Sequence, residues 1–243
     1  MEELEAPRYL PAPSMSDGQR LLINQARDLI PNPWVGDSVS KVIGFQHPQN
    51  LPYPTTPLEI IRDGSPTLGG FVARTSDLPS SGTTGAVRDR FALSYPDSPF
   101  PADGPHAVIT TRVNTSLSEN IRIPRSGGPD GFVPGTMPAN SRRIDGDPPY
   151  QGTGYTSSTD GYLAPEYHTT PTAMDAGANA QGNAVTVMTV KNSDGAPYGI
   201  PVDSPNLPAG FPTQYADADG FLPADWKLVP DASSPTGNSW EPL

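Results

Sequence analysis

The chain has 243 residues, of which 32 are prolines and 24 are glycines, and its formal net charge at pH 7 is −11. It contains no cysteine, which excludes disulfides, thiolate catalysis and zinc–thiolate sites. The acidic balance argues against nucleic acid as a partner, because phosphate binding needs clustered lysine and arginine. Proline and glycine at this density disfavour long helices and wide sheets. We therefore expect a mainly β fold with extensive irregular and extended structure: a small antiparallel β body, one N-terminal helix and long proline-rich arms.

The first 57 residues, 1–57, are predicted to form an N-terminal arm that contains the helix. A Ser-x-x-Gln capping pattern begins at Ser16, apolar side chains then recur on one helical face, and Pro31 follows. These signals predict a helix over 16–30, and a shorter turn is expected over 37–43. The first residues are acidic and lack the features of a signal peptide, and no apolar window is long enough to cross a bilayer. We therefore expect no membrane insertion.

Three further windows are poor in proline and predict the strands of the β body, which is expected over 58–195. Residues 87–95 and 107–113 alternate apolar and polar side chains, the two-residue period of a half-buried strand. Residues 121–123 are the predicted neighbour of the second of these strands. Residues 184–190 are apolar on both faces, which predicts a central strand.

The remaining segments contain too many prolines for the interior of a sheet. We expect them to run as polyproline-like arms, and the clearest cases are 46–57, 96–105, 124–149 and 197–212. The last of these opens a C-terminal proline-rich arm, which is predicted to comprise 196–243.

The dipeptide Asp-Gly occurs eight times and predicts turns, because aspartate caps its own backbone and glycine accepts a positive φ. Three of these turns continue with an aromatic residue, an aliphatic residue and a proline, and their aromatic residues are Phe132, Tyr162 and Phe221. One interpretation is an aromatic side chain held on an ordered turn for insertion into a neighbouring subunit. The alternative is that each aromatic residue covers the chain's own small core.

No pattern in the sequence indicates a catalytic residue or a cofactor. The three histidines, His47, His106 and His168, lie far apart and lack the spacing of a helical metal pair, so we read them as surface or turn residues. A loose calcium site using Asp217, Asp219 and Asp225 is a weak alternative to three solvated acidic turns.

These features favour a non-enzymatic structural protein of a large assembly, namely a minor capsid, cement or connector protein of a virus or phage particle. Its expected location is the virion, or alternatively an extracellular or cell-surface assembly, and its expected partners are the major structural subunits and copies of itself. The residues predicted to bind those partners are Phe132, Tyr162, Phe221, Trp226 and Trp34. The alternative is a soluble all-β binding module, lectin-like or an adhesin domain, with a ligand site among the tyrosines and Trp34, Trp226 and Trp240. A hydrolase built on aspartate pairs is a third hypothesis.

Overall fold

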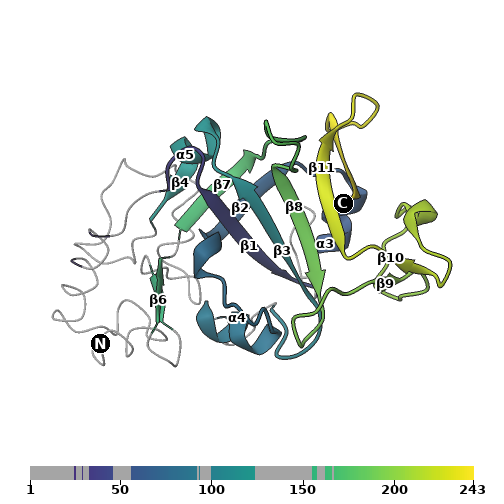
Figure 1. The fold of residues 1–243 in the computed structure, drawn as a ribbon, viewed down its shortest axis with the longest axis horizontal. Coiled ribbons are helices and arrows are strands. Elements are labelled where there is room, and N and C mark those ends of the chain that lie inside the picture. Colours follow the sequence, from purple (N-terminus) through teal and green to yellow (C-terminus); the bar gives the residue numbers. More distant parts are fainter. Residues whose placement is uncertain are drawn as a thin grey trace.

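The structure is a computed structural model, and it describes residues 25, 29, 33–45, 56–91, 93, 100–123, 155–157, 162–165 and 167–243. As predicted, the chain is mainly β. An antiparallel sheet of eight strands, in the order β12-β11-β8-β3-β1-β2-β7-β4, dominates the described part (Figure 1). Its strands are β1 (Ser38–Gly44), β2 (Thr67–Arg74), β3 (His106–Arg112), β4 (Ile121–Arg122), β7 (Tyr167–Ala173), β8 (Thr186–Lys191), β11 (Asp225–Pro230) and β12 (Asn238–Pro242).

Shorter elements are attached to this sheet. Two small two-stranded sheets pair β5 (Tyr155–Ser157) with β6 (Leu163–Pro165), and β9 (Ile200–Pro201) with β10 (Phe221–Leu222). The described α-helices are α3 (Pro57–Arg62), α4 (Thr84–Arg90) and α5 (Thr115–Asn120). Two 3-10 turns cover Thr75–Asp77 and Thr213–Tyr215.

The predicted strands 107–113 and 184–190 are confirmed as β3 and β8. β3 lies between β1 and β8 and pairs with both along its length. Alternate residues of the three strands therefore share one face, where Ile109 and Met188 are direct cross-strand neighbours. Both strands are interior to the sheet, which agrees with the apolar character of residues 184–190.

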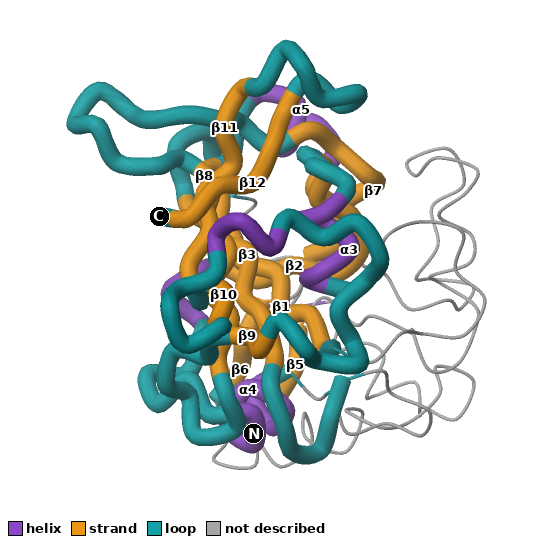
Figure 2. The backbone as a smooth tube through the Cα atoms, turned by 90° about the vertical axis from the view of Figure 1, so that its right-hand side faces the viewer, coloured by secondary structure: helices purple, strands orange, loops and turns teal. Residues whose placement is uncertain are grey.

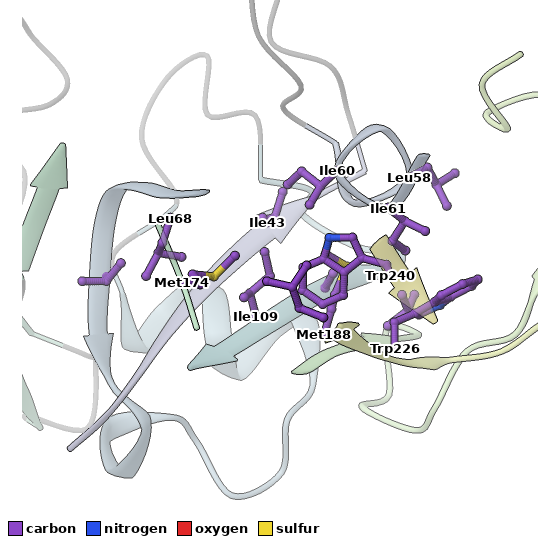
Figure 3. Packing of buried hydrophobic residues seen from close by; sticks show 14 of the residues in the cluster. Ile43, Leu58, Ile60, Ile61, Leu68, Ile109, Met174, Met188, Trp226 and Trp240 are labelled. Carbon is purple, nitrogen blue, oxygen red and sulfur yellow. The ribbon is translucent and has the colours of Figure 1, made fainter. Parts of the chain in front are cut away.

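The main core lies between this face and α3, which crosses it (Figure 2). α3 begins sharply, because Thr56 and Glu59 form a capping box and Pro57 occupies the first turn. Its apolar residues Ile60 and Ile61 point toward the other core residues, and Leu58 is buried as well (Figure 3). Trp240 of β12 closes the same core, and its indole N–H donates to the Ser65 carbonyl at 3.2 Å.

On the opposite face of the sheet, a smaller cluster of apolar side chains packs under α4. Val108 and His106 point to this face, since they alternate with the core residues of β3. Val87 of α4 and Phe100 are buried there, and the rings of Phe100 and His106 lie 5.7 Å apart. The sheet is thus covered on both faces at its centre.

The strand predicted over 87–95 is wrong, because residues 84–90 form α4. Thr83 caps the helix by accepting a hydrogen bond from the Ala86 N–H at 3.2 Å. Val87 and Phe91 lie four residues apart, so the same apolar residues that fit a strand period also fit one helical face.

Two local predictions around β1 and β4 are also corrected. The turn predicted over 37–43 is the strand β1, because this segment pairs with β3 over seven positions. Residues 121–122 form β4, but β4 pairs with β7 rather than with β3. The predicted connection before it contains α5, which Asn114 caps by accepting from the Leu117 N–H at 2.7 Å.

The predicted segmentation into arms differs from the structure at both ends. β1 lies inside the segment assigned to the N-terminal arm, and 196–243 supplies two strands of the main sheet, so it is not an arm. Within 197–212, Ile200 and Phe211 are buried in the core. The helix predicted over 16–30, apart from residues 25 and 29, lies outside the described residues, as do 46–55 and 124–149.

Candidate interaction sites

The turn that leads into β1 presents two large apolar side chains to solvent. Trp34 is 74% exposed and Val35 is 61% exposed. The Trp34 N–H donates to Asp37 Oδ2 at 2.7 Å, and the Asp37 N–H donates to the Trp34 carbonyl at 2.9 Å. Gly36, at φ 99°, donates its N–H to the Val113 carbonyl at 2.8 Å, which ties the turn to the end of β3. Trp34 and Val35 are therefore held on an ordered turn.

Phe221 occupies a comparable position at the start of β10, directly after a turn. It is 43% exposed, whereas the next residue, Leu222, is buried in the core. The Asp217 carboxylate fixes the turn, because its Oδ1 accepts from the N–H groups of Asp219 at 3.0 Å and Phe221 at 2.8 Å. In this turn the aromatic ring of Phe221 is therefore directed outward and the side chain of Leu222 inward.

Tyr162, the second aromatic residue of this pattern, is 38% exposed and contacts two other segments. Its hydroxyl donates to Asp77 Oδ1 at 2.7 Å, and this hydrogen bond raises the pKa of Tyr162. Asp77 also accepts from Arg74 Nε at 2.9 Å. The Arg90 guanidinium lies 3.8 Å from the centre of the Tyr162 ring. Part of this ring is thus covered by its own chain.

Trp226 does not lie on the surface, and its assignment to partner binding is corrected. It is fully buried, its indole N–H donates to the Pro223 carbonyl at 2.9 Å, and Phe211 and Tyr215 stack edge-on against it. Trp240 is buried in the same core. An aromatic ligand site that uses both tryptophans is therefore not formed. Phe132 lies outside the described residues.

His106 and His168 are internal residues of the sheet rather than surface residues. The Thr84 hydroxyl donates to the Gly104 carbonyl at 2.7 Å, so it accepts from His106 Nδ1 at 3.0 Å, and the His106 proton resides on Nδ1. Within the described residues, His106 Nε2 is buried without a hydrogen-bond partner. Burial, reinforced by the charge of Lys191, lowers the pKa of His106 to about 4. Burial and the charge of Lys41 lower the pKa of His168 to about 4.

Lys41 is an amine in an apolar layer, since it lies on β1 between Val39 and Ile43, two residues of the core. Its ammonium donates to the carbonyl of Gly69, beside the bulge of β2 at Gly70. Desolvation by burial lowers the pKa of Lys41 to about 8. The ammonium therefore links β1 to the irregular part of β2.

The described residues include no group of three histidine, aspartate or glutamate side chains that could hold a metal ion. Of the three aspartates considered for calcium, Asp217 accepts hydrogen bonds within its own turn, and Asp225 accepts from the Thr189 hydroxyl at 2.7 Å. The calcium hypothesis thus gains no support here. The expectation of no catalytic residue and no cofactor stays a prediction.

Comparisons of the chain with protein-family models, with curated proteins and with solved structures found no match. Within the described residues, no helix is long and apolar enough to span a bilayer. The case for function therefore depends on the geometry of the exposed aromatic residues.

Sequence reasoning selected Trp34 but not its neighbour Val35. The signal that could have found the pair is an apolar dipeptide placed directly before Gly36 and Asp37, because a turn leaves little room to bury it. No signal in the sequence indicates that Tyr162 meets Asp77, since 85 residues separate them.

Replacing Gly220 by alanine tests the turn that holds Phe221. Gly220 has φ +81°, and we expect Gly220→Ala to lower the free energy of unfolding by about 1 kcal/mol, because a Cβ strains this conformation. Gly85, in α4 with open space around it, is the matched control, and Gly85→Ala should stabilise by about 0.5–1 kcal/mol. Urea unfolding of both variants measures the difference. Equal effects would contradict the role assigned to Gly220.

Proposed function

We propose that the protein is a non-enzymatic structural component of a virus or phage particle, a minor capsid, cement or connector protein that bridges major subunits. Its partners are those subunits, and it can also contact copies of itself. In this proposal the protein resides in the virion.

The observation that carries the proposal is the ordered turn with Trp34 and Val35 exposed. Tryptophan is among the residues that contribute most to protein interfaces, and a surface side chain of this size is costly to leave in water. The turn is fixed by hydrogen bonds to Asp37 and Val113 before any partner binds, so docking loses little conformational entropy. Phe221, on its own fixed turn, offers a second contact of the same kind.

The proline-dense segments support the same proposal from the sequence. A polyproline strand extends about 3 Å per residue and loses little entropy when it docks, so it suits contact with distant neighbours. The sequence intervals 46–57 and 124–149 are rich in proline, and in this proposal they act as such arms.

Sedimentation of native material tests the proposal directly. The source lysate is separated on a density gradient, and the chain is quantified by mass spectrometry in each fraction. We expect the chain to sediment with a large particle at a constant ratio to one abundant structural subunit. Recovery only as a free chain of 25.7 kDa would refute the proposal.

Replacing Trp34 by alanine tests the proposed contact. If Trp34 docks on a major subunit, Trp34→Ala should weaken the contact by about 2 kcal/mol, roughly 30-fold, because the anchor of the interface is lost. Trp34→Phe keeps an aromatic ring and should retain most of the incorporation. Incorporation is measured as the ratio of the variant to the major subunit in purified particles. Normal occupancy of Trp34→Ala would place the contact elsewhere.

A further inference from the structure

The dipeptide Asp-Gly is also the sequence in which an aspartyl peptide bond rearranges most readily. The main-chain nitrogen of the glycine attacks Cγ of the aspartate and closes a succinimide ring, and glycine hinders this closure least because it has no Cβ. The reaction is favoured where the nitrogen is held close to the carboxyl carbon. Four of the eight Asp-Gly pairs lie in the part of the chain that the structure describes, and they begin at Asp63, Asp103, Asp194 and Asp219.

In three of these pairs the N–H of the glycine donates to a main-chain carbonyl of its own turn. The donors and acceptors are Gly64 and Ile61 at 3.2 Å, Gly195 and Asn192 at 3.1 Å, and Gly220 and Asp217 at 3.1 Å. Two of the carboxylates are bonded elsewhere as well. Asp63 accepts from Arg62 Nε at 2.6 Å, and Asp194 Oδ1 accepts from the Ala196 N–H at 3.0 Å. These turns therefore hold each glycine nitrogen against another acceptor.

The pair Asp103–Gly104, in the turn before β3, is arranged differently. The Gly104 N–H donates to Oδ1 of the Asp103 carboxylate itself at 2.8 Å. Because Oδ1 is covalently bonded to Cγ, the attacking nitrogen and the carbon that it attacks lie side by side, as in a near-attack conformer. Asp103 is exposed, and no described atom lies within 4 Å of the position that a Cβ on Gly104 would take. The pair therefore has access to water and room to close the ring.

We propose that Asp103–Gly104 is a site of spontaneous isoaspartate formation and the fastest of the four described pairs. The Gly104 nitrogen bonds to Asp103 Cγ, and its proton leaves with the hydroxyl of the carboxyl group as one water. Hydrolysis of the ring then adds one water and breaks the bond between the Gly104 nitrogen and the main-chain carbonyl carbon of Asp103. That carbon becomes a free α-carboxylate. The two steps are redox-neutral, and the backbone afterwards runs through Cγ and is longer by one carbon.

The rearrangement reaches the interior of the fold through Gly104. Its carbonyl accepts from the Thr84 hydroxyl at 2.7 Å, and the same hydroxyl accepts from His106 Nδ1 at 3.0 Å. Thr84 lies in the first turn of α4 and His106 lies at the start of β3, so these hydrogen bonds join the helix to the sheet. An extra backbone carbon directly before Gly104 displaces its carbonyl. We therefore expect the rearrangement to loosen α4 from the sheet.

Incubation of the isolated full chain at neutral pH tests the site within one molecule. Isoaspartate at the four described pairs is quantified by peptide mapping with electron-transfer fragmentation, which distinguishes the two isomers by mass spectrometry. We expect isoaspartate to accumulate at least about fivefold faster at Asp103 than at any of the other three pairs. In urea the turn geometry is lost, so this difference should disappear. Equal rates in the folded chain, or the same difference in urea, would overturn the inference.

The variant Asp103→Glu provides the control for the consequence in α4. It keeps the carboxylate, but ring closure would need a larger and slower-forming ring, so residue 103 should not isomerise. Amide hydrogen exchange in α4 should accelerate with incubation time in the wild type and stay constant in Asp103→Glu. Asp219→Glu removes another exposed Asp-Gly pair and should age as the wild type does.

Acceleration that is equal in the wild type and in Asp103→Glu would overturn the link between Gly104 and α4. The comparison of the four pairs in the wild type stands even if the variant fails to fold. No measurement here uses a particle or a partner, so the outcome does not depend on the proposed function.

Discussion

Trp226→Ala will lower the free energy of unfolding by about 3–5 kcal/mol, the range for a large aromatic side chain removed from a packed core. The indole is fully buried on β11, and Phe211 and Tyr215 lie against it at ring distances of 6.0 and 5.7 Å. Its removal leaves a cavity and deprives the Pro223 carbonyl of its donor. Chemical denaturation of the wild type and the variant, followed by far-ultraviolet circular dichroism, measures the loss.

Trp34→Ala is the matched control, since it removes the same side chain from an exposed turn. We expect its free energy of unfolding to lie within about 0.5 kcal/mol of the wild type, as for surface substitutions in general. The two variants thus compare the buried tryptophan with the exposed tryptophan that is proposed to bind a partner. Similar losses in both variants would mean that Trp34 is packed by residues outside the described part of the chain.

Acidification from pH 6.5 to pH 4 will destabilise the protein through His106 and His168. Both folded pKa values are about 4, below the ordinary value of 6.5, so the folded chain binds fewer protons than the unfolded chain in this interval. The stabilisation is fully present above pH 6.5 and is lost as the pH falls to 4. For the fully buried His106 the loss approaches about 3 kcal/mol, and the half-buried His168 contributes less.

The neighbours of the two imidazoles explain why protonation is unfavourable. His106 has the charge of Lys191 nearby, and no described residue accepts a proton from its Nε2, while His168 lies near the ammonium of Lys41. NMR titration of the two imidazole Cε1–H signals gives the folded pKa values, and urea unfolding at several pH values gives the stability. A midpoint near 6.5 for His106 would show that its ring is solvated and would remove the basis of the prediction.

The strands β3 and β8 could be predicted because local pattern and tertiary environment agree in them. Residues 107–113 and 184–190 contain β-branched side chains and no proline, and both strands pair with a neighbour on each side in the sheet. The segment of β1 lacked such a distinct pattern, since Lys41 interrupts its apolar face. Its strand conformation follows from pairing with β3, which no local signal reveals.

The prediction that 196–243 forms an arm was wrong because it was based on the density of prolines. The prolines near β11 and β12 lie at or beyond strand ends, where the missing N–H costs little, and β11 between them alternates Trp226 and Leu228 inward. From the sequence alone, a tryptophan fits a buried core position as well as it fits a binding surface. The partner-binding role of Trp34 stays a prediction, and only the structure shows that Trp34 is exposed whereas Trp226 is buried.

The strand order has a consequence for how the chain reaches its folded state. The centre of the sheet joins β1, β3 and β8, and hydrogen bonds between neighbouring strands there connect residues 70 and 75 positions apart. Trp240 closes the core against Ser65 across 175 positions. A growing polypeptide cannot complete this sheet until nearly all of it has left the ribosome, and distant pairings of this kind are slow to form. Nascent and truncated forms should expose unpaired strands, so productive folding will depend on chaperones or low concentration more strongly than the modest size suggests.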